Sequence, residues 1–482
     1  MKRILLDYPL HLEKIFEKEA SSIFMTTLSV NPEDRPLQWN RLFTFFRCAV
    51  TLMISLTASS CSCIPSPLTT PNKAYHTGPA AVKKLEAGAW LGHVEFDDQG
   101  ELWSHNQLRI VTEKIRSVAA RGRVKLILYA HGWNNTARED APLGKNFEQF
   151  ENLLNALAEI HSEGQDNYPY QIFGVFLSWR GHEFPRRAGI DIWDRLQAAS
   201  RVGGLSGTEA VVDLALAART NPQSLVLLTG HSLGTIIAEN TANRVLMSHV
   251  LEAKYRRGGG HTGPLFDIVL LVNSAQSSLI PHQMIAGLKA QGARYRNHGH
   301  QDVPLIFLLT AQDDWLTGKL FPLSVLFARA NPLNTQVSGK VRGRYADGPD
   351  GDTHDPASQR TTQFMAGAHN ASLRSHTMVA LDRKTSGSSA PPDRNSMKNA
   401  ILENLDSGKR FAGDSIEIHG DSSNFLLQRS MGAWNNTPYW VCSTPKEFFS
   451  GHSGFWDNNN TVALTAALLG INGERARLSS EL

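Results

Sequence analysis

Short, unbroken apolar runs alternate with amphipathic stretches through the middle of the chain. Three such runs have the length of strands: VKLILYA (124–130), QIFGVFLSW (171–179) and SLVLLTG (224–230). Runs of this kind predict strands that are buried on both faces. Helical spacing of apolar residues recurs between them, at 107–120, 147–161, 192–202 and 208–219. Strands that alternate with helices predict a parallel sheet with crossover helices.

The same alternation continues toward the C-terminus. Further strands are predicted at 266–275, 303–311 and 437–443, and further helices at 235–251, 285–293 and 462–470. Before the first buried strand, WLGHVEFDDQGELWS (90–104) alternates in polarity around a turn and predicts a hairpin at the sheet edge. Between about 331 and 421, Gly, Ser, Asp, Pro and Arg dominate without periodicity. This predicts a long irregular insertion before the last strand of an α/β domain that spans 83–482.

The N-terminal segment, 1–82, has another pattern. Arg41 and Arg47 precede an apolar stretch that ends in small residues and Cys61, and the Pro-rich linker IPSPLTTPNK follows. This layout predicts an export signal. Small residues before a cysteine resemble a bacterial lipoprotein signal, in which Cys61 would carry the lipid; an uncleaved membrane anchor is the alternative. Either form predicts a domain attached to a membrane of the bacterial cell envelope, outside the cytoplasm.

Charge and cysteine content change this picture little. The formal net charge is +3 over 482 residues, and the basic residues are scattered, so composition provides no electrostatic case for nucleic-acid binding. Of the four cysteines, Cys63 and Cys442 are candidates for a disulfide in an oxidising compartment, and a free buried Cys442 is equally compatible with the sequence. No cysteine pair has the spacing of a metal finger.

A G-x-S-x-G motif lies directly between a predicted strand and a predicted helix. It consists of Gly230, His231, Ser232, Leu233 and Gly234. In this setting the motif places a serine hydroxyl on a tight turn clear of the sheet, and the flanking glycines relieve the crowding that a Cβ would cause. The motif predicts Ser232 as a nucleophile.

A tetrahedral intermediate on Ser232 needs two N–H donors for its oxyanion. The N–H of Leu233, which follows the nucleophile, is the predicted first donor. The first buried strand ends in His-Gly-Trp-Asn-Asn, where Gly132 allows the loop to approach the serine and the N–H of Trp133 is the predicted second donor. We expect His131 to anchor this loop by hydrogen bonds, because a histidine after a buried strand more often does so than acts as base or metal ligand.

With these motifs the chain resembles the esterases and lipases of the α/β-hydrolase fold. The resemblance implies a mostly parallel sheet with helices on both faces, and the chain order serine, acid, histidine. The acid should follow a late strand, where VPLIFLLTAQDDW offers Asp314, with Asp313 as the alternative. The base should follow the last strand, and His452 lies there in a Gly-bounded loop. Three histidines of the irregular segment are poorer candidates: His354, His369 and His376.

Further motifs are similar to those of a group of uncharacterised bacterial α/β hydrolases, over roughly 90–470. They are DDWLTGKLFP (313–322), Trp-Arg-Gly at 179–181 and DIWDR (191–195). Arg180 is a candidate partner for a carboxylate or a residue of the acyl pocket, and Trp193 is a candidate core residue. The resemblance does not say which carboxylic ester is the substrate.

The predicted function is hydrolysis of a small-molecule or lipid ester, or a thioester, through an acyl-enzyme on Ser232, without a metal or organic cofactor. One alternative is a membrane-tethered binding protein that keeps the fold without turnover. Another is a metal-dependent hydrolase, because His298, His300 and Asp302 follow the His-x-His-x-Asp order of dinuclear zinc sites. Oligomeric state is not indicated by the sequence.

Overall fold

We describe a computed structural model of the chain. It describes residues 74–137, 146–162, 170–181, 192–255, 265–291, 304–321, 366–370, 373–381, 395, 397, 399, 415–420, 423–430, 437–453 and 459–480. All of these belong to one unit, formed by 73–183 and 191–482. Several predicted features lie outside the described residues: the export signal with Cys61, the linker, Cys63, His298, His300, Asp302, His354 and the Trp193 side chain.

Eleven strands of the described part of the chain form one sheet, in the order β1-β2-β4-β3-β5-β6-β7-β11-β8-β10-β9. Neighbouring strands are parallel from β2 to β8, and β1, β10 and β9 are antiparallel to their neighbours. The strands are β1 (Val82–Lys84), β2 (Trp90–Glu95), β3 (Val124–Ala130), β4 (Gln171–Ser178), β5 (Leu225–His231), β6 (Ile268–Val272), β7 (Ile306–Ala311), β8 (His376–Ala380), β9 (Ser415–His419), β10 (Asn424–Arg429) and β11 (Tyr439–Thr444).

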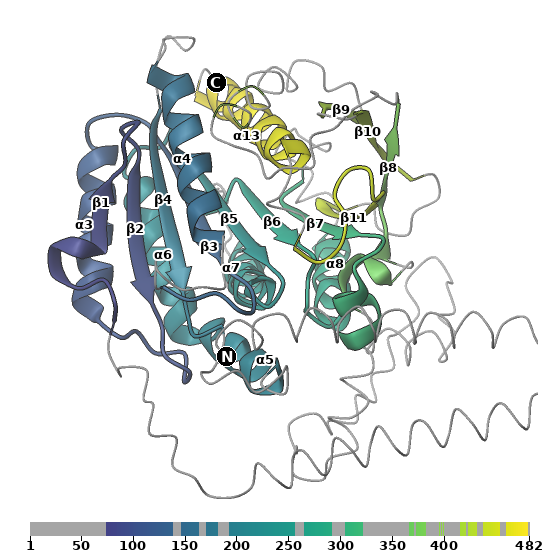
Figure 1. Ribbon diagram of the computed structural model, residues 1–482, viewed down its shortest axis with the longest axis horizontal. Helices are drawn as coiled ribbons and strands as arrows, with labels where there is room; N and C mark the ends of the chain where they lie inside the picture. Colours follow the sequence, from purple (N-terminus) through teal and green to yellow (C-terminus); the bar gives the residue numbers. More distant parts are fainter. Residues whose placement is uncertain are drawn as a thin grey trace, which may run out of the picture. The chain divides into compact units, whose positions relative to one another are not determined.

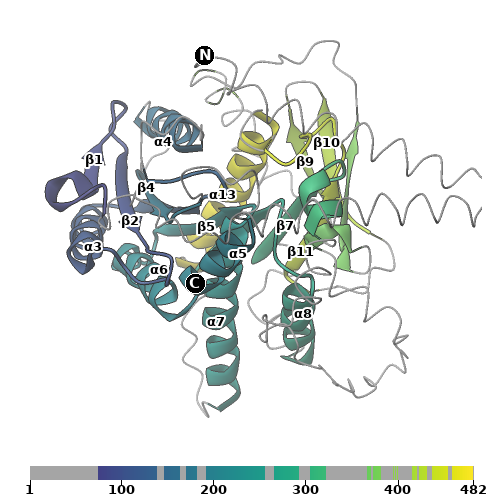
Figure 2. The same ribbon diagram turned by 60° about the horizontal axis from the view of Figure 1, so that its bottom comes forward.

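Helices cover both faces of the sheet (Figures 1 and 2). The longer ones are α3 (His105–Ala119), α4 (Asn146–Ser162), α5 (Ile192–Val202), α6 (Leu205–Ala218), α7 (Gly234–Tyr255), α8 (Leu279–Gln291) and α13 (Asn459–Ser480); the short ones are η2 (Gly78–Ala81), η3 (Leu316–Leu320) and η5 (Gly367–His369). No helix within the described ranges is long and apolar enough to cross a membrane.

The unbroken apolar strands are explained by two separate cores. Successive side chains of a strand point to opposite faces, so in β3 Leu126 and Leu128 enter one core while Ile127 and Tyr129 enter the other. The first core is closed by α3, α6, α7 and α8, and the second by α4 and α13. The structure is therefore α/β, with a mostly parallel open sheet, as the alternation of strands and helices predicts.

The hairpin predicted at 90–104 is confirmed only next to its turn, where the Asp97 amide donates to the Glu101 carbonyl at 2.8 Å and the Trp103 amide to the Glu95 carbonyl at 3.0 Å. Its place at the sheet edge is wrong, because β1 lies outside β2. Trp90–Glu95 forms β2, which pairs with β1 on one side and runs parallel to β4 on the other, while the second arm is reduced to one bridge between Phe96 and Leu102. The alternation of apolar and polar residues in 90–95 suggests a strand with one face in solvent, but its polar residues are buried as well. Glu95 is 3% exposed and accepts bonds from the amides of Tyr75 and His76, both at 2.8 Å.

The predicted irregular insertion also needs correction. Two segments within its bounds are strands, β8 and β9, and with β10 they extend the same sheet beyond β11 (Figure 1). Both are short and alternate between buried and more exposed side chains. His376 of β8 stacks on Trp440 with ring centroids 3.9 Å apart, so this imidazole is held firmly, against expectation.

Cys442 is free and buried, as one of the two alternatives has it, and Cys63, its candidate disulfide partner, lies outside the described residues. Cys442 lies in β11 and is fully buried. Burial raises the pKa of its thiol to about 12, which leaves it protonated and inert.

A buried acid on α7 makes stability depend on pH. Glu239 is fully buried and accepts a 2.7 Å hydrogen bond from the Tyr439 hydroxyl, and burial raises its pKa to about 8. Unfolding lets this carboxyl ionise near its ordinary pKa of 4.5. From pH 4.5 to about 8 the unfolded state therefore binds fewer protons than the folded one, and stability falls as pH rises.

We expect Glu239→Gln to remove this dependence, because the amide oxygen can still accept from Tyr439 and cannot ionise. In that pH window the free energy of unfolding of the wild type should fall by up to about 1.4 kcal/mol per pH unit more than that of the variant. Urea unfolding followed at several pH values measures the difference. Glu209→Gln, on the exposed face of α6, is the control and should leave the wild-type slope unchanged; equal slopes for Glu239→Gln and wild type would contradict the prediction.

Candidate active site

Ser232 occupies a sharp turn between β5 and α7. Its φ is +55°, in the left-handed region that non-glycine residues rarely adopt. The turn is held by bonds from the Ser232 amide to the Val272 carbonyl and from the Thr235 amide to the Ser232 carbonyl, both 3.0 Å. A Cβ at Gly234 would lie 2.1 Å from the Ala130 carbonyl oxygen, and one at Gly230 would also meet backbone. The glycines of the motif are thus required by close packing.

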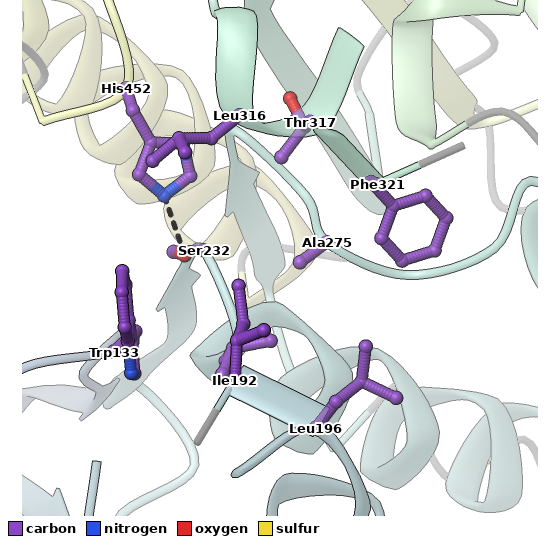
Figure 3. Close-up of a pocket in the computed structure, with 10 residues that line it drawn as sticks. Trp133, Ile192, Leu196, Ser232, Ala275, Leu316, Thr317, Phe321 and His452 are labelled. Carbon is purple, nitrogen blue, oxygen red and sulfur yellow. Dashed lines mark hydrogen bonds between the residues drawn. The ribbon is translucent and has the colours of Figure 1, made fainter. Parts of the chain in front are cut away.

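The side chains of Ser232, His452 and Asp314 come together above the carboxyl ends of β5, β7 and β11. His452 Nε2 is 2.6 Å from Ser232 Oγ, and His452 Nδ1 is 3.0 Å from both carboxylate oxygens of Asp314. Because an ionised carboxylate can only accept, Nδ1 carries the proton and Nε2 is free to accept from the serine hydroxyl (Figure 3).

Of the two neighbouring acids, Asp314 is the one that contacts His452. Asp314 is 2% exposed, while Asp313 is exposed and accepts from Ser450 Oγ and from the Gly451 amide at 2.8 Å. Burial alone would raise the pKa of Asp314, but the neighbouring His452 and hydrogen bonds from His452 and Thr317 outweigh it and lower that pKa. Asp314 is therefore the ionised partner of His452. Asp313 instead holds the loop that carries His452, through its bonds to Ser450 and Gly451.

The loop after β3 lies against the serine turn. A Cβ at Gly132 would be 2.8 Å from Ser232 Cβ and 2.9 Å from the His231 carbonyl oxygen, so only glycine allows this approach. The amides of Trp133 and Leu233 make no hydrogen bond to another described residue, and both residues line the pocket beside Ser232. Two N–H groups are thereby left to bind an oxyanion.

His131 anchors this loop. Its Nδ1 donates to the Gly132 carbonyl at 2.9 Å, and its Nε2 accepts from the Trp179 amide at 3.2 Å. The Trp179 indole in turn donates to the His131 carbonyl at 2.9 Å, and backbone bonds join Gly181 to Asn134 and Asn135. The Trp-Arg-Gly segment after β4 thus holds the loop that carries Trp133, through Trp179 and Gly181.

Two side chains for which the sequence predicts no side-chain role, those of Asn273 and His231, hold the histidine loop. Asn273 is fully buried at the end of β6 and donates to the carbonyls of Gly451 (3.0 Å) and His452 (2.7 Å), while it accepts from the Ala311 amide (2.9 Å). His231 Nε2 donates to the same His452 carbonyl at 2.8 Å. Burial, with His452 nearby, lowers the pKa of His231 to about 4, which keeps it neutral.

The signal that could have revealed Asn273 is its position. It is a polar residue directly after a buried strand, VLLVN, and the carboxyl ends of parallel strands line one edge of a sheet. Its φ of +45° shows that the strand turns sharply there. His231 was assigned only to the turn, and its side-chain role depends on residues more than 200 positions away in sequence.

No family model, curated protein or solved structure matches this chain. The interpretation of the site therefore depends on the contacts within this chain alone.

The pocket that contains Ser232 and His452 is almost entirely apolar (Figure 3). Its other lining residues come from several elements: Trp133, Ile192, Leu196, Leu233, Ala275, Leu316, Thr317 and Phe321. Helix α5 forms one side of it and η3 the other. No carboxylate, Lys or Arg lines it among the described residues.

An ion pair fixes α5. Arg195, 2% exposed, donates to both carboxylate oxygens of Asp98, at 2.7 and 3.3 Å, and to the Arg180 carbonyl at 2.8 Å. The Arg180 side chain lies 3.8 Å from the same carboxylate. Arg180 thus pairs with a carboxylate, which is one of its two predicted roles, and it is not among the residues that line the pocket.

Proposed function

We propose that this protein is a serine hydrolase of the α/β-hydrolase fold that cleaves carboxylic esters or thioesters. The observation that supports this most directly is the unbroken chain of hydrogen bonds from Ser232 through His452 to Asp314. The left-handed serine turn, which places Ser232 on the pocket, and two amides beside it without a partner among the described residues add what acyl transfer requires, a nucleophile and an oxyanion site.

In this mechanism Asp314 holds the Nδ1–H tautomer of His452. His452 Nε2 takes the proton of Ser232 as the oxygen attacks the ester carbonyl, and the amides of Leu233 and Trp133 stabilise the oxyanion. His452 then gives that proton to the departing alcohol or thiol. A water molecule, deprotonated by His452, attacks the acyl-enzyme, and collapse of the second intermediate releases the carboxylic acid and returns the proton to Ser232.

The apolar lining favours a substrate with an uncharged, apolar acyl chain. A carboxylate at the far end of the acyl group would be desolvated there without a cationic partner among the lining residues, which is costly. The resemblance of 41–61 to an export signal adds the proposal that hydrolysis takes place at a membrane of the cell envelope.

The test is covalent labelling of the purified full-length protein with a fluorophosphonate, which reacts with activated serines. We expect one adduct per chain, mapped by mass spectrometry to the peptide that contains Ser232, and absent in Ser232→Ala. A panel of aryl esters then measures substrate preference, with butyrate and hexanoate esters hydrolysed faster than the hemisuccinate.

A folded wild-type protein that neither reacts with the probe nor cleaves any ester would contradict the proposal. It would favour the non-catalytic, membrane-tethered alternative. Rapid hydrolysis without an adduct on Ser232 would instead indicate a different nucleophile.

A further inference from the structure

A second histidine, His369, is linked to Asp314 through the hydroxyl of Thr317. His369 Nε2 is 3.0 Å from Thr317 Oγ1, and the Thr317 hydroxyl is 2.5 Å from Asp314 Oδ2. Both residues are at least partly buried. Sequence alone makes His369 a poorer candidate for the site, because it falls in a segment of irregular composition.

The direction of these hydrogen bonds follows from their chemistry. The Asp314 carboxylate is ionised and can only accept, so the Thr317 hydroxyl donates to it. Thr317 Oγ1 has then used its one proton, and the contact with His369 requires that Nε2 donates. The result is a continuous series of donors that runs from His369 through Thr317 to Asp314.

The position of His369 is closely defined by its surroundings. Its ring lies against Gly318, where a Cβ would come within 2.9 Å of the ring carbon Cε1. The turn that carries it, η5, is fixed by a bond from the His369 amide to the Ala366 carbonyl at 3.1 Å, and the Arg374 side chain donates to the Ala368 carbonyl at 2.8 Å. An imidazole packed in this way can hold a hydroxyl in one rotamer.

Thr317 has a competing use for its hydroxyl. It lines the pocket with Ser232 and His452, so a hydroxyl that rotated away from Asp314 would point its proton elsewhere, including toward a bound ester. The bond to the Asp314 carboxylate favours the rotamer that faces Asp314, and the donor contact from His369 adds to that preference.

We propose that His369 is a positioning residue of this site. Through Thr317 it holds the Asp314 carboxylate in the orientation that bonds His452 Nδ1, and it keeps the Thr317 proton away from the substrate. This inference rests on the proposed serine hydrolase function, and it adds the segment before β8 to the parts of the chain that support catalysis.

The experiment is a double-mutant cycle with His369→Phe, Thr317→Val and the double variant, measured as kcat and KM for an aryl ester. We expect Thr317→Val to lower kcat about tenfold and His369→Phe about fivefold, the scale of one hydrogen bond, with KM nearly unchanged. Because His369 acts through Thr317, the double variant should equal Thr317→Val. His369→Gln, which keeps an N–H donor, and Thr317→Ser, which keeps the hydroxyl, should recover most of the activity.

Multiplicative losses in the double variant would overturn the proposal, as would full activity in His369→Phe or equal losses in His369→Gln and His369→Phe.

A spectroscopic measurement separates these outcomes from failure of the proposed function. The proton on His452 Nδ1 gives a low-field NMR resonance that reports on its bond to Asp314 without turnover, since hydrogen bonds in series polarise one another. Introduced into the wild type, His369→Phe should shift this resonance. Introduced into the Thr317→Val variant, it should cause no further shift. If His369→Phe shifts the resonance in neither protein, the positioning role is refuted, even for an inactive protein.

Discussion

Asp314→Asn will lower kcat for an aryl ester about 10⁴-fold, with little change in KM. The carboxylate now accepts from His452 Nδ1 at 3.0 Å. An asparagine amide can donate to that nitrogen, which moves the imidazole proton to Nε2. A protonated Nε2 cannot accept the Ser232 proton, so the nucleophile is not activated.

Asp313→Asn is the matched control, one residue away with the same change in charge and volume. Its bonds go to Ser450 and Gly451, and an asparagine oxygen can still accept one of them. We expect a loss of no more than about threefold, the scale of one weakened exposed hydrogen bond. A larger loss in Asp313→Asn than in Asp314→Asn would reverse the assignment of the acid, and thermal unfolding of both variants excludes misfolding as the cause.

Gly132→Ala is expected to lower kcat about 10² to 10³-fold, as the loss of one oxyanion donor does. The added Cβ would lie 2.8 Å from Ser232 Cβ, too close for any real contact, and the atoms it meets belong to the serine turn itself. The loop must move away, and it takes the Trp133 amide with it. Because the apolar pocket is otherwise intact, KM should change far less than kcat.

Gly122→Ala provides the comparison, because a Cβ there meets nothing within 4 Å. It should retain full activity. If Gly132→Ala remained folded and lost less than about threefold in kcat, well under the value for one oxyanion donor, the loop after β3 would have no part in stabilising the oxyanion.

The central strands and the serine turn could be predicted because their signals are local. VKLILYA and SLVLLTG are buried on both faces, so apolar residues dominate both sequences, and the turn needs glycines at fixed offsets from Ser232. Asp314 and His452 were predicted from the order serine, acid, histidine that the family resemblance implies, and from their places after the strands β7 and β11. The strands and the turn, by contrast, depend on neighbours within a few residues.

The features that sequence analysis missed depend on distant partners. Glu95 is a charged residue in a buried strand, and its carboxylate accepts hydrogen bonds from the amides of residues 75 and 76 and from the Gln107 side chain. The role of Asn273 is set by carbonyls 178 and 179 positions away, and that of His369 by Thr317, 52 positions away. Polarity patterns contain no information on such pairings.

The place of β11 has a consequence for the order in which this chain becomes active. It lies between β7 and β8, although both precede it in the sequence. As the chain is synthesised, the segments with Ser232 and Asp314 emerge long before the strand that brings His452, and in the folded sheet that strand lies between two earlier ones. A nascent chain without β11 thus has a serine without its base, and on the proposed mechanism it is inactive toward esters until β11 takes its place.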